Sequence, residues 1–136
     1  IHTNGMFYER LKTILAQKLV DHVSLDIKNA PSAYAKTCGV EDMDLKDIEK
    51  SLDLLKQSVV PYDICVTLVD ELHNQATIEE LGEWIQGVDT VILQPFEDRE
   101  TTIDHSLHRP RFKVVLKYKK IFEKYVKHVK IRGDQA

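Results

Sequence analysis

Strand-type and helix-type patterns alternate along the whole chain, and no hairpin signal joins any two strands. The helical segments place apolar side chains three or four positions apart, whereas the strand segments are short runs rich in Val, Ile and Thr. Strands that alternate with helices at this spacing pair in parallel through right-handed connections. The chain is therefore predicted to be an α/β protein with a parallel sheet or part of a barrel, with helices near 6–18, 44–60, 77–86 and 112–126 and strands near 22–28, 62–69, 90–94 and 129–132.

Local signals mark the ends of these elements. Asp44 is expected to cap the second helix, and Thr77 and Glu80 have the spacing of a capping box for the third. The connection between the first strand and the second helix has room for a short helical turn around residues 33–36.

Each predicted strand keeps one polar side, because successive side chains of a strand point to opposite faces. Val23, Leu25 and Ile27 share the dry face of the first strand, and Ser24, Asp26 and Lys28 share the other; the next two strands alternate Ile64, Val66 and Leu68 with Cys65 and Thr67, and Val91 and Leu93 with Thr90, Ile92 and Gln94. Strands covered by helices on both sides tend to be apolar on both faces. A polar inner face favours a barrel with a site at the carboxyl ends of its strands.

The residues alone leave the role of Asp26 and Lys28 open. The two side chains can line such a site, or they can form a local ion pair or cap the next loop. Ser24 and Thr67 are interpreted as packing residues rather than catalytic ones. No nucleotide-binding glycine motif, hydrolase GxSxG or zinc-protease HExxH occurs, and His73, His105 and His108 are expected to be solvent-exposed loop residues rather than a metal site.

Composition limits the class of protein. The 136 residues, 43% hydrophobic and 30% charged, suit one globular domain, and a net charge of −3 gives no reason to expect nucleic acid or an anionic membrane as partner. The Lys- and Arg-rich run 109–132 is interpreted as a solvated helix face. Cys38 and Cys65 are far apart and form no disulfide framework, and no apolar run reaches the ~20 residues of a membrane span, so a reducing, cytoplasmic setting is expected.

A family resemblance is carried by five segments in a fixed order, namely Thr3-Asn4-Gly5, 20–28, 66–73, 92–96 and 129–133. With these segments at these distances, the chain resembles the C-terminal half of a radical S-adenosylmethionine activating enzyme. The likeness is greatest to the activators of anaerobic ribonucleoside-triphosphate reductase and of pyruvate formate-lyase, and it covers essentially the whole sequence.

This resemblance implies a partial (β/α)6 barrel of the TIM type that binds S-adenosylmethionine and a four-iron, four-sulfur cluster on a CxxxCxxC loop. Reductive cleavage of the cofactor yields a radical that abstracts hydrogen from a glycine of the partner, a glycyl radical enzyme that works anaerobically. In that frame Lys28 suits the methionyl carboxylate and Phe96 suits the adenine ring. The residues implied to face the cofactor, a bound cation or the substrate peptide are Thr3, Asn4, Gly5, Asp26, Lys28, Thr67, Gln94 and Phe96.

The sequence also departs from the family pattern. The cluster motif and the first two strands of the barrel are missing, and Cys38 and Cys65 cannot supply three thiolates. Cys65 stands where relatives often carry Arg, Asp70 where they carry Pro, and His2 where some carry an acid. Residues 1–136 are therefore expected to be a C-terminal fragment of the barrel that neither binds the cluster nor cleaves S-adenosylmethionine, and whose open strand edge pairs with an N-terminal half or with a second copy.

Two alternatives to this interpretation remain at the sequence level. One is a non-catalytic binding or scaffold module that kept the half barrel without the chemistry. The other is an unrelated α/β fold in which the pair Asp26 and Lys28 is purely structural.

Overall fold

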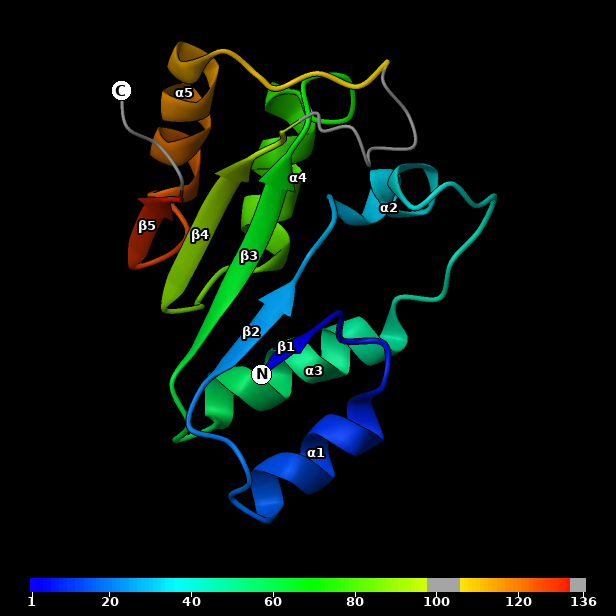
Figure 1. Ribbon diagram of the computed structural model, residues 1–136, viewed down its shortest axis with the longest axis vertical. Coiled ribbons are helices and arrows are strands. Elements are labelled where there is room, and N and C mark those ends of the chain that lie inside the picture. The colour runs from blue at the N-terminus through cyan, green and yellow to red at the C-terminus, as the bar shows by residue number, and fades with distance from the viewer. Residues whose placement is uncertain (98–105, 133–136) are drawn as a thin grey trace.

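The computed structural model describes residues 1–97 and 106–132 of the chain. Within these residues five strands form one all-parallel sheet in the order β1-β2-β3-β4-β5, so that each strand lies beside the next one along the chain (Figure 1). The elements are β1 His2–Thr3, α1 Tyr8–Ala16, β2 Val23–Asp26, α2 Pro31–Thr37, α3 Lys46–Gln57, β3 Tyr62–Leu68, α4 Gln75–Trp84, β4 Thr90–Pro95, α5 Phe112–Phe122 and β5 His128–Ile131.

The two faces of the sheet differ as the alternating pattern predicts. Helices cover one face of the sheet (Figure 1). Leu25, Ile64 and Leu93 share one side of their strands, and each is fully buried. Burying an aliphatic side chain of this size contributes about 1.5–3 kcal/mol to folding. On the opposite, inner face, Cys65 and Gln94 are only half-buried and Thr67 is exposed. The inner face is thus the side of the sheet that is open to a ligand or to another protein.

The predicted elements are confirmed, with shifted ends and two additions. A short first strand, β1, pairs with β2, and the connection after β2 holds a complete helix, α2, rather than a single turn. The strand β2 ends at Asp26, although the Ile27 N–H still donates to the Cys65 carbonyl at 3.0 Å. Helix α5 ends at Phe122: the Glu123 N–H still donates to the Lys119 carbonyl four residues back, but the Lys124 and Tyr125 N–H groups donate to carbonyls three residues back.

The predicted start of α4 is wrong by one turn. The capping residue is Asn74, whose Oδ1 accepts the Thr77 N–H at 2.9 Å, while Thr77 Oγ1 accepts the Asn74 N–H at 3.0 Å. Thr77 is therefore the third residue of the helix rather than its cap. Asn satisfies an unpaired N–H of the first turn as well as Thr does. The segment therefore contains two residues that could cap the helix, Asn74 and Thr77, and the structure uses Asn74.

The helices are short and amphipathic. In α3, which has 12 residues, Ile48, Leu52 and Leu55 form the predicted buried stripe. The N-cap residue is Leu45 rather than the predicted Asp44, whose Oδ1 nevertheless accepts the Lys46 N–H at 2.9 Å. None of the helices in the described ranges is both long and apolar enough to cross a membrane.

Candidate functional site

The inner face of the sheet is hollowed into a groove of ≈ 400 Å³, here called the inner groove. Parallel strands bring their carboxyl ends to one edge of the sheet, which gathers side chains that are far apart in sequence. Five of the eight predicted site residues line the groove: Thr3, Asn4, Asp26, Thr67 and Gln94. His2, Cys65 and Arg132 complete its lining.

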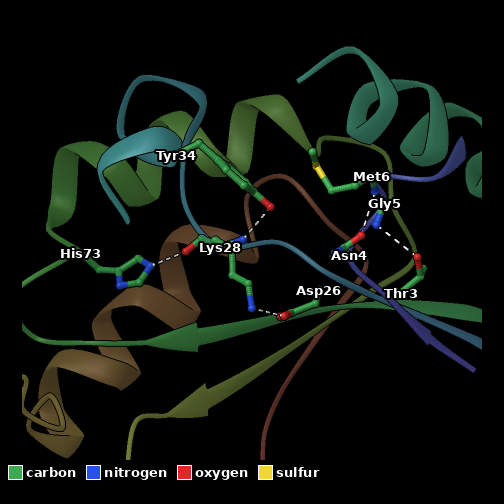
Figure 2. A network of polar contacts seen from close by, with 8 residues as sticks. All are labelled: Thr3, Asn4, Gly5, Met6, Asp26, Lys28, Tyr34 and His73. Atoms are coloured by element: carbon green, nitrogen blue, oxygen red, sulfur yellow. Dashed lines mark hydrogen bonds and ion pairs between the residues drawn. The ribbon is translucent and has the colours of Figure 1, made fainter. Parts of the chain in front are cut away.

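The Thr3-Asn4-Gly5 turn divides into two roles. Thr3 Oγ1 accepts the Gly5 N–H at 3.2 Å and Asn4 Oδ1 accepts the Met6 N–H at 2.9 Å, so both side chains brace the turn while lining the groove (Figure 2). Gly5 is buried outside the groove, with a left-handed φ of 75°. The turn therefore presents two polar side chains and packs its glycine against the core.

Asp26 and Lys28 form the local ion pair that the sequence left open, between Nζ and Oδ2 (Figure 2). Only Asp26 belongs to the groove lining; the Lys28 side chain is 45% exposed. A pair this exposed contributes at most about 1 kcal/mol to stability. The ammonium of Lys28 is thus already engaged by Asp26, beside the groove rather than in it.

The main chain of Lys28 is held from two sides. Its N–H donates to the Tyr34 hydroxyl at 3.1 Å, and its carbonyl accepts from His73 Nε2 at 3.0 Å (Figure 2). Burial is the main cause that raises the pKa of Tyr34 to about 12, so its hydroxyl is neutral near pH 7. Two buried side chains therefore fix the backbone from which Lys28 reaches Asp26.

His73 is buried, 4% exposed, so the prediction of an exposed loop residue is wrong. The Val69 N–H donates to Nδ1 at 3.1 Å, which leaves Nε2 as the protonated nitrogen that donates to Lys28. Burial lowers the pKa of His73 below its ordinary value, which keeps the ring neutral. His108 is exposed as predicted and contacts Glu71 at 2.6 Å; His105 lies outside the described residues.

Acidification below pH 6.5 is expected to destabilise the fold through His73. The unfolded chain takes up a proton at the ordinary pKa of 6.5, whereas the buried ring resists it. The contribution of neutral His73 to the free energy of unfolding is fully present above pH 6.5. It is lost as the pH falls through the lowered pKa of His73 in the folded chain, by at most about 1.4 kcal/mol per pH unit. Urea unfolding between about pH 7 and pH 5 measures the slope.

The variant His73→Gln should flatten this slope, and His128→Gln, at an exposed position, should keep it. The acids Glu71 and Glu79 also have a lowered pKa, mainly because they bond to His108 and Lys124. Their stabilisation is present above their ordinary pKa of 4.5 and is lost below it, in a separate window. An unchanged slope in His73→Gln would contradict the assignment.

Cys65 lines the inner groove as a protonated thiol. Its Sγ lies 3.3 Å from Asp63 Oδ1, and Asp63 Oδ2 in turn lies 3.1 Å from His22 Nε2. Burial first, and then the hydrogen bond to Asp63, raise the pKa of the thiol to about 11, which the nearby charge of Arg132 only partly opposes. A protonated thiol is a poor nucleophile and a poor metal ligand near neutral pH.

Arg132 is a groove residue that the sequence reasoning missed. The register pairs Leu93 with Ile131, which places Arg132 next to Gln94, and its Nη1 donates to Gln94 Oε1 at 3.4 Å. The sequence did contain a pattern that could have indicated Arg132. Side chains of a strand alternate between its two faces, so the last predicted strand has Lys130 and Arg132 on the same face. Gly133, the last residue of the matching segment, lies outside the described residues.

Phe96 follows β4 but does not line the groove. Its N–H donates to the Leu68 carbonyl at 2.8 Å, which continues the pairing of β4 with β3, and its side chain is half-buried. Three of the eight predicted residues, Gly5, Lys28 and Phe96, are thus close in sequence to the groove lining without being part of it. Their predicted contact with a cofactor stays a prediction.

A metal site is not apparent in the described ranges 1–97 and 106–132, where no group of three or more His, Cys, Asp and Glu side chains is placed to hold an ion. Cys38 is exposed and Cys65 is half-buried on the sheet. An iron–sulfur cluster needs several converging thiolates, and these residues do not fit one.

Comparison with known proteins finds a relative that is similar over nearly the whole chain. A curated protein of Methanocaldococcus jannaschii, assigned by its name as a glycyl-radical enzyme activating enzyme, is 27% identical over 137 residues, which cover 97% of this chain. The predicted resemblance is confirmed. The chain spans 57% of the length of that relative. No protein-family model matches the present chain.

Two solved structures share the fold. A domain of the pyruvate-formate lyase-activating enzyme of Bacteroides vulgatus superposes with a TM-score of 0.71 at 16% identity, covering 96% of this chain and 79% of that one. A radical SAM methyltransferase of Sphaerobacter thermophilus gives a TM-score of 0.70 at 13% identity, covering 96% and 39%. The predicted α/β fold of parallel strands and alternating helices is confirmed, and both of these solved structures share it.

Proposed function

We propose that this chain forms the cofactor- and substrate-facing wall of a radical S-adenosylmethionine enzyme that generates a glycyl radical on a partner enzyme. The observation that carries the proposal is the inner groove, where five residues implied by the resemblance come together from β1, β2, β3, β4 and their following turns. The similarity along nearly the whole chain to a protein named for glycyl-radical activation supports the same role.

The chemistry of the groove fits part of S-adenosylmethionine. A groove of ≈ 400 Å³ lies within the range of small-ligand sites, roughly 300–1,000 Å³. Asp26 supplies a carboxylate at one side and Arg132 a guanidinium at the other, which match the ammonium and the carboxylate of a zwitterionic methionyl group. Thr67 and Gln94 add neutral hydrogen-bonding groups between them.

The iron–sulfur cluster does not fit these residues, so the proposal assigns it to another segment or another chain. The edge strand β1 has a free side on which such a segment could pair, because within the described residues it pairs only with β2. Ile1 and Phe7, close to β1 in the sequence, are 46% and 59% exposed. An unpaired strand edge flanked by exposed apolar groups is normally covered in a native protein. The covering element is proposed to be an N-terminal half barrel or a second copy of this chain.

The protein substrate is proposed to be a glycyl radical enzyme of the anaerobic ribonucleotide reductase or pyruvate formate-lyase type. The inner face is open to solvent along β3, where Thr67 is exposed, so a peptide loop can approach the groove. Anaerobic redox chemistry would belong to the assembled enzyme and not to this wall alone.

The proposal is tested by titrating the chain with S-adenosylmethionine. Binding is monitored by the NMR chemical shifts of the Thr67 and Gln94 amides. Asp26→Asn should weaken binding about tenfold, because a hydrogen bond to a charged group is worth about 1.5–3 kcal/mol. Asp53→Asn removes an exposed acid on α3 and should leave binding unchanged. Anaerobic treatment with iron and sulfide should give no cluster absorption.

Two results would contradict the proposal in different ways. Stoichiometric iron on the isolated chain would show that it holds the cluster itself. Absence of any shift at Thr67 and Gln94 at saturating S-adenosylmethionine would favour a binding or scaffold module without the chemistry.

A further inference from the structure

Helix α5 carries a stripe of cationic side chains on the face turned away from the sheet. Lys113, Leu116, Lys117 and Lys120 follow the spacing of one helix face and are all exposed, while Val115 on the opposite side is buried. These four residues, here called the basic stripe, line a shallow groove of ≈ 420 Å³ together with Lys119 and Glu123.

The three lysines of the basic stripe have no acidic partner in the part of the chain that the structure describes. Lys119 pairs with Glu123 at 3.5 Å, but Lys113, Lys117 and Lys120 form no ion pair with any described residue. Like charges three or four positions apart destabilise a helix by about 0.2–0.5 kcal/mol per pair. Within the described residues no acidic side chain offsets this repulsion, and only Lys120 gains from its place in the last turn of the helix, where a positive charge is favourable.

The stripe also has an apolar centre. Leu116 is 39% exposed between the lysines, and the lysine stems extend the apolar surface around it. A solvated helix face needs no leucine at this place, whereas a docking surface gains from one apolar contact within a ring of charges.

The positive charge is concentrated in this region. Residues 109–132 contain ten Lys and Arg against one acid, Glu123, although the whole chain has a net charge of −3. The remaining sequence is correspondingly acidic, so the basic stripe stands out as a positive surface on a negative molecule. Such a surface attracts a compact acidic group more than an extended polyanion, which would also meet the negative remainder.

We propose that the basic stripe docks an acidic helical segment of a protein partner, with carboxylates three and four positions apart and an apolar residue over Leu116. From Lys113 to Lys120 the stripe rises about 10 Å, at 1.5 Å per residue, which suits two helical turns and is short for a nucleic-acid track. Membrane binding requires a broad apolar face, and the apolar face of α5 is packed on the sheet.

This surface is separate from the inner groove. Helix α5 belongs to the helical layer (Figure 1). The inner groove is lined by inner-face residues of the strands and shares no lining residue with the basic stripe. The stripe can therefore hold a partner without occupying the cofactor side, and the inference does not depend on the function proposed for the groove.

Fluorescence anisotropy with a labelled helical peptide tests the inference on the full chain. The probe carries Glu at positions i, i+4 and i+7 with Leu at i+3. Lys113→Glu/Lys117→Glu/Lys120→Glu should weaken its binding about tenfold, from three ion pairs of about 0.5 kcal/mol each. Leu116→Ala should weaken it about fivefold through lost apolar contact, and binding should fall as salt rises.

The matched control is Lys12→Glu/Lys36→Glu/Lys46→Glu, which makes the same change in net charge at exposed lysines of other helices. It should bind the peptide as the parent chain does, and circular dichroism should show native helix content for both triple variants. Equal binding by the two triple variants would overturn the proposal. The proposal would also be overturned if the chain bound duplex DNA or phosphatidylserine vesicles more tightly than the peptide and the lysine-to-glutamate variant of the basic stripe lost that binding.

Discussion

Replacing Asn29 by alanine is expected to lower the free energy of unfolding by about 2–5 kcal/mol, because two backbone groups lose their partner in the core. Asn29 is fully buried. Its Nδ2 donates to the Leu72 carbonyl at 2.7 Å and to Thr37 Oγ1 at 3.0 Å, and its Oδ1 accepts the Ala30 N–H at 2.8 Å. One amide thus ties the end of β2 to α2 and to the loop after β3.

Chemical denaturation of Asn29→Ala beside Asn74→Ala measures this effect. The Asn74 side chain also accepts a backbone N–H, that of Thr77, but at an exposed helix start, where its loss should cost about 1 kcal/mol. A cost for Asn29→Ala no larger than that for Asn74→Ala would mean that water replaces the buried amide. The loosened loop would also release Lys28, since His73 approaches it from the same connection.

Asn29 illustrates which part of the fold the sequence predicts. The order of strands and helices around this residue was predicted, but the hydrogen bonds of its side chain were not. The strand predicted near 22–28 ends before Asn29, and in the structure the strand and the next helix indeed lie on either side of this residue. The alternation of strands and helices depends on local periodicity, so a single sequence suffices to predict parallel βα units. The partners of Asn29 lie at Thr37 and Leu72, and no local pattern indicates which distant carbonyl a buried amide will meet.

The candidate site shows the same division. Period-two alternation placed Asp26, Thr67 and Gln94 on one face, and the sheet register brings them to one groove. His73 was expected in solvent because it follows a strand in a polar loop, yet it closes on Lys28, 45 positions away. Burial of a loop histidine is decided by tertiary packing, which outweighs local polarity.

The resemblance treated Thr3-Asn4-Gly5 as one cofactor-facing unit, and the structure separates its parts. Thr3 and Asn4 face the groove, whereas the Gly5 carbonyl accepts from Ser51 Oγ at 3.1 Å on the helical side. The turn therefore connects the site to α3. Its glycine is required by packing, which is a different constraint from ligand binding.

Replacing Gly5 by alanine is expected to cost about 2–5 kcal/mol, as the sum of backbone strain of about 1–2 kcal/mol and overpacking of about 1–3 kcal/mol. An added Cβ would lie 2.9 Å from Leu25 Cδ1 and 3.4 Å from Ile48 Cα. Leu25 is fully buried, so its methyl group has no free space to move into. Thermal or urea unfolding of the variant measures the cost.

Gly39→Ala separates the two causes, because Gly39 has nearly the same φ, 77°, and no atom within 4 Å of an added Cβ. It should show the backbone strain alone, about 1–2 kcal/mol. A second test combines Gly5→Ala with Leu25→Val, which removes the conflicting methyl group; the double variant should be more stable than the sum of the single effects. Equal costs for Gly5→Ala and Gly39→Ala, with no coupling to Leu25, would mean that Gly5 serves backbone conformation only.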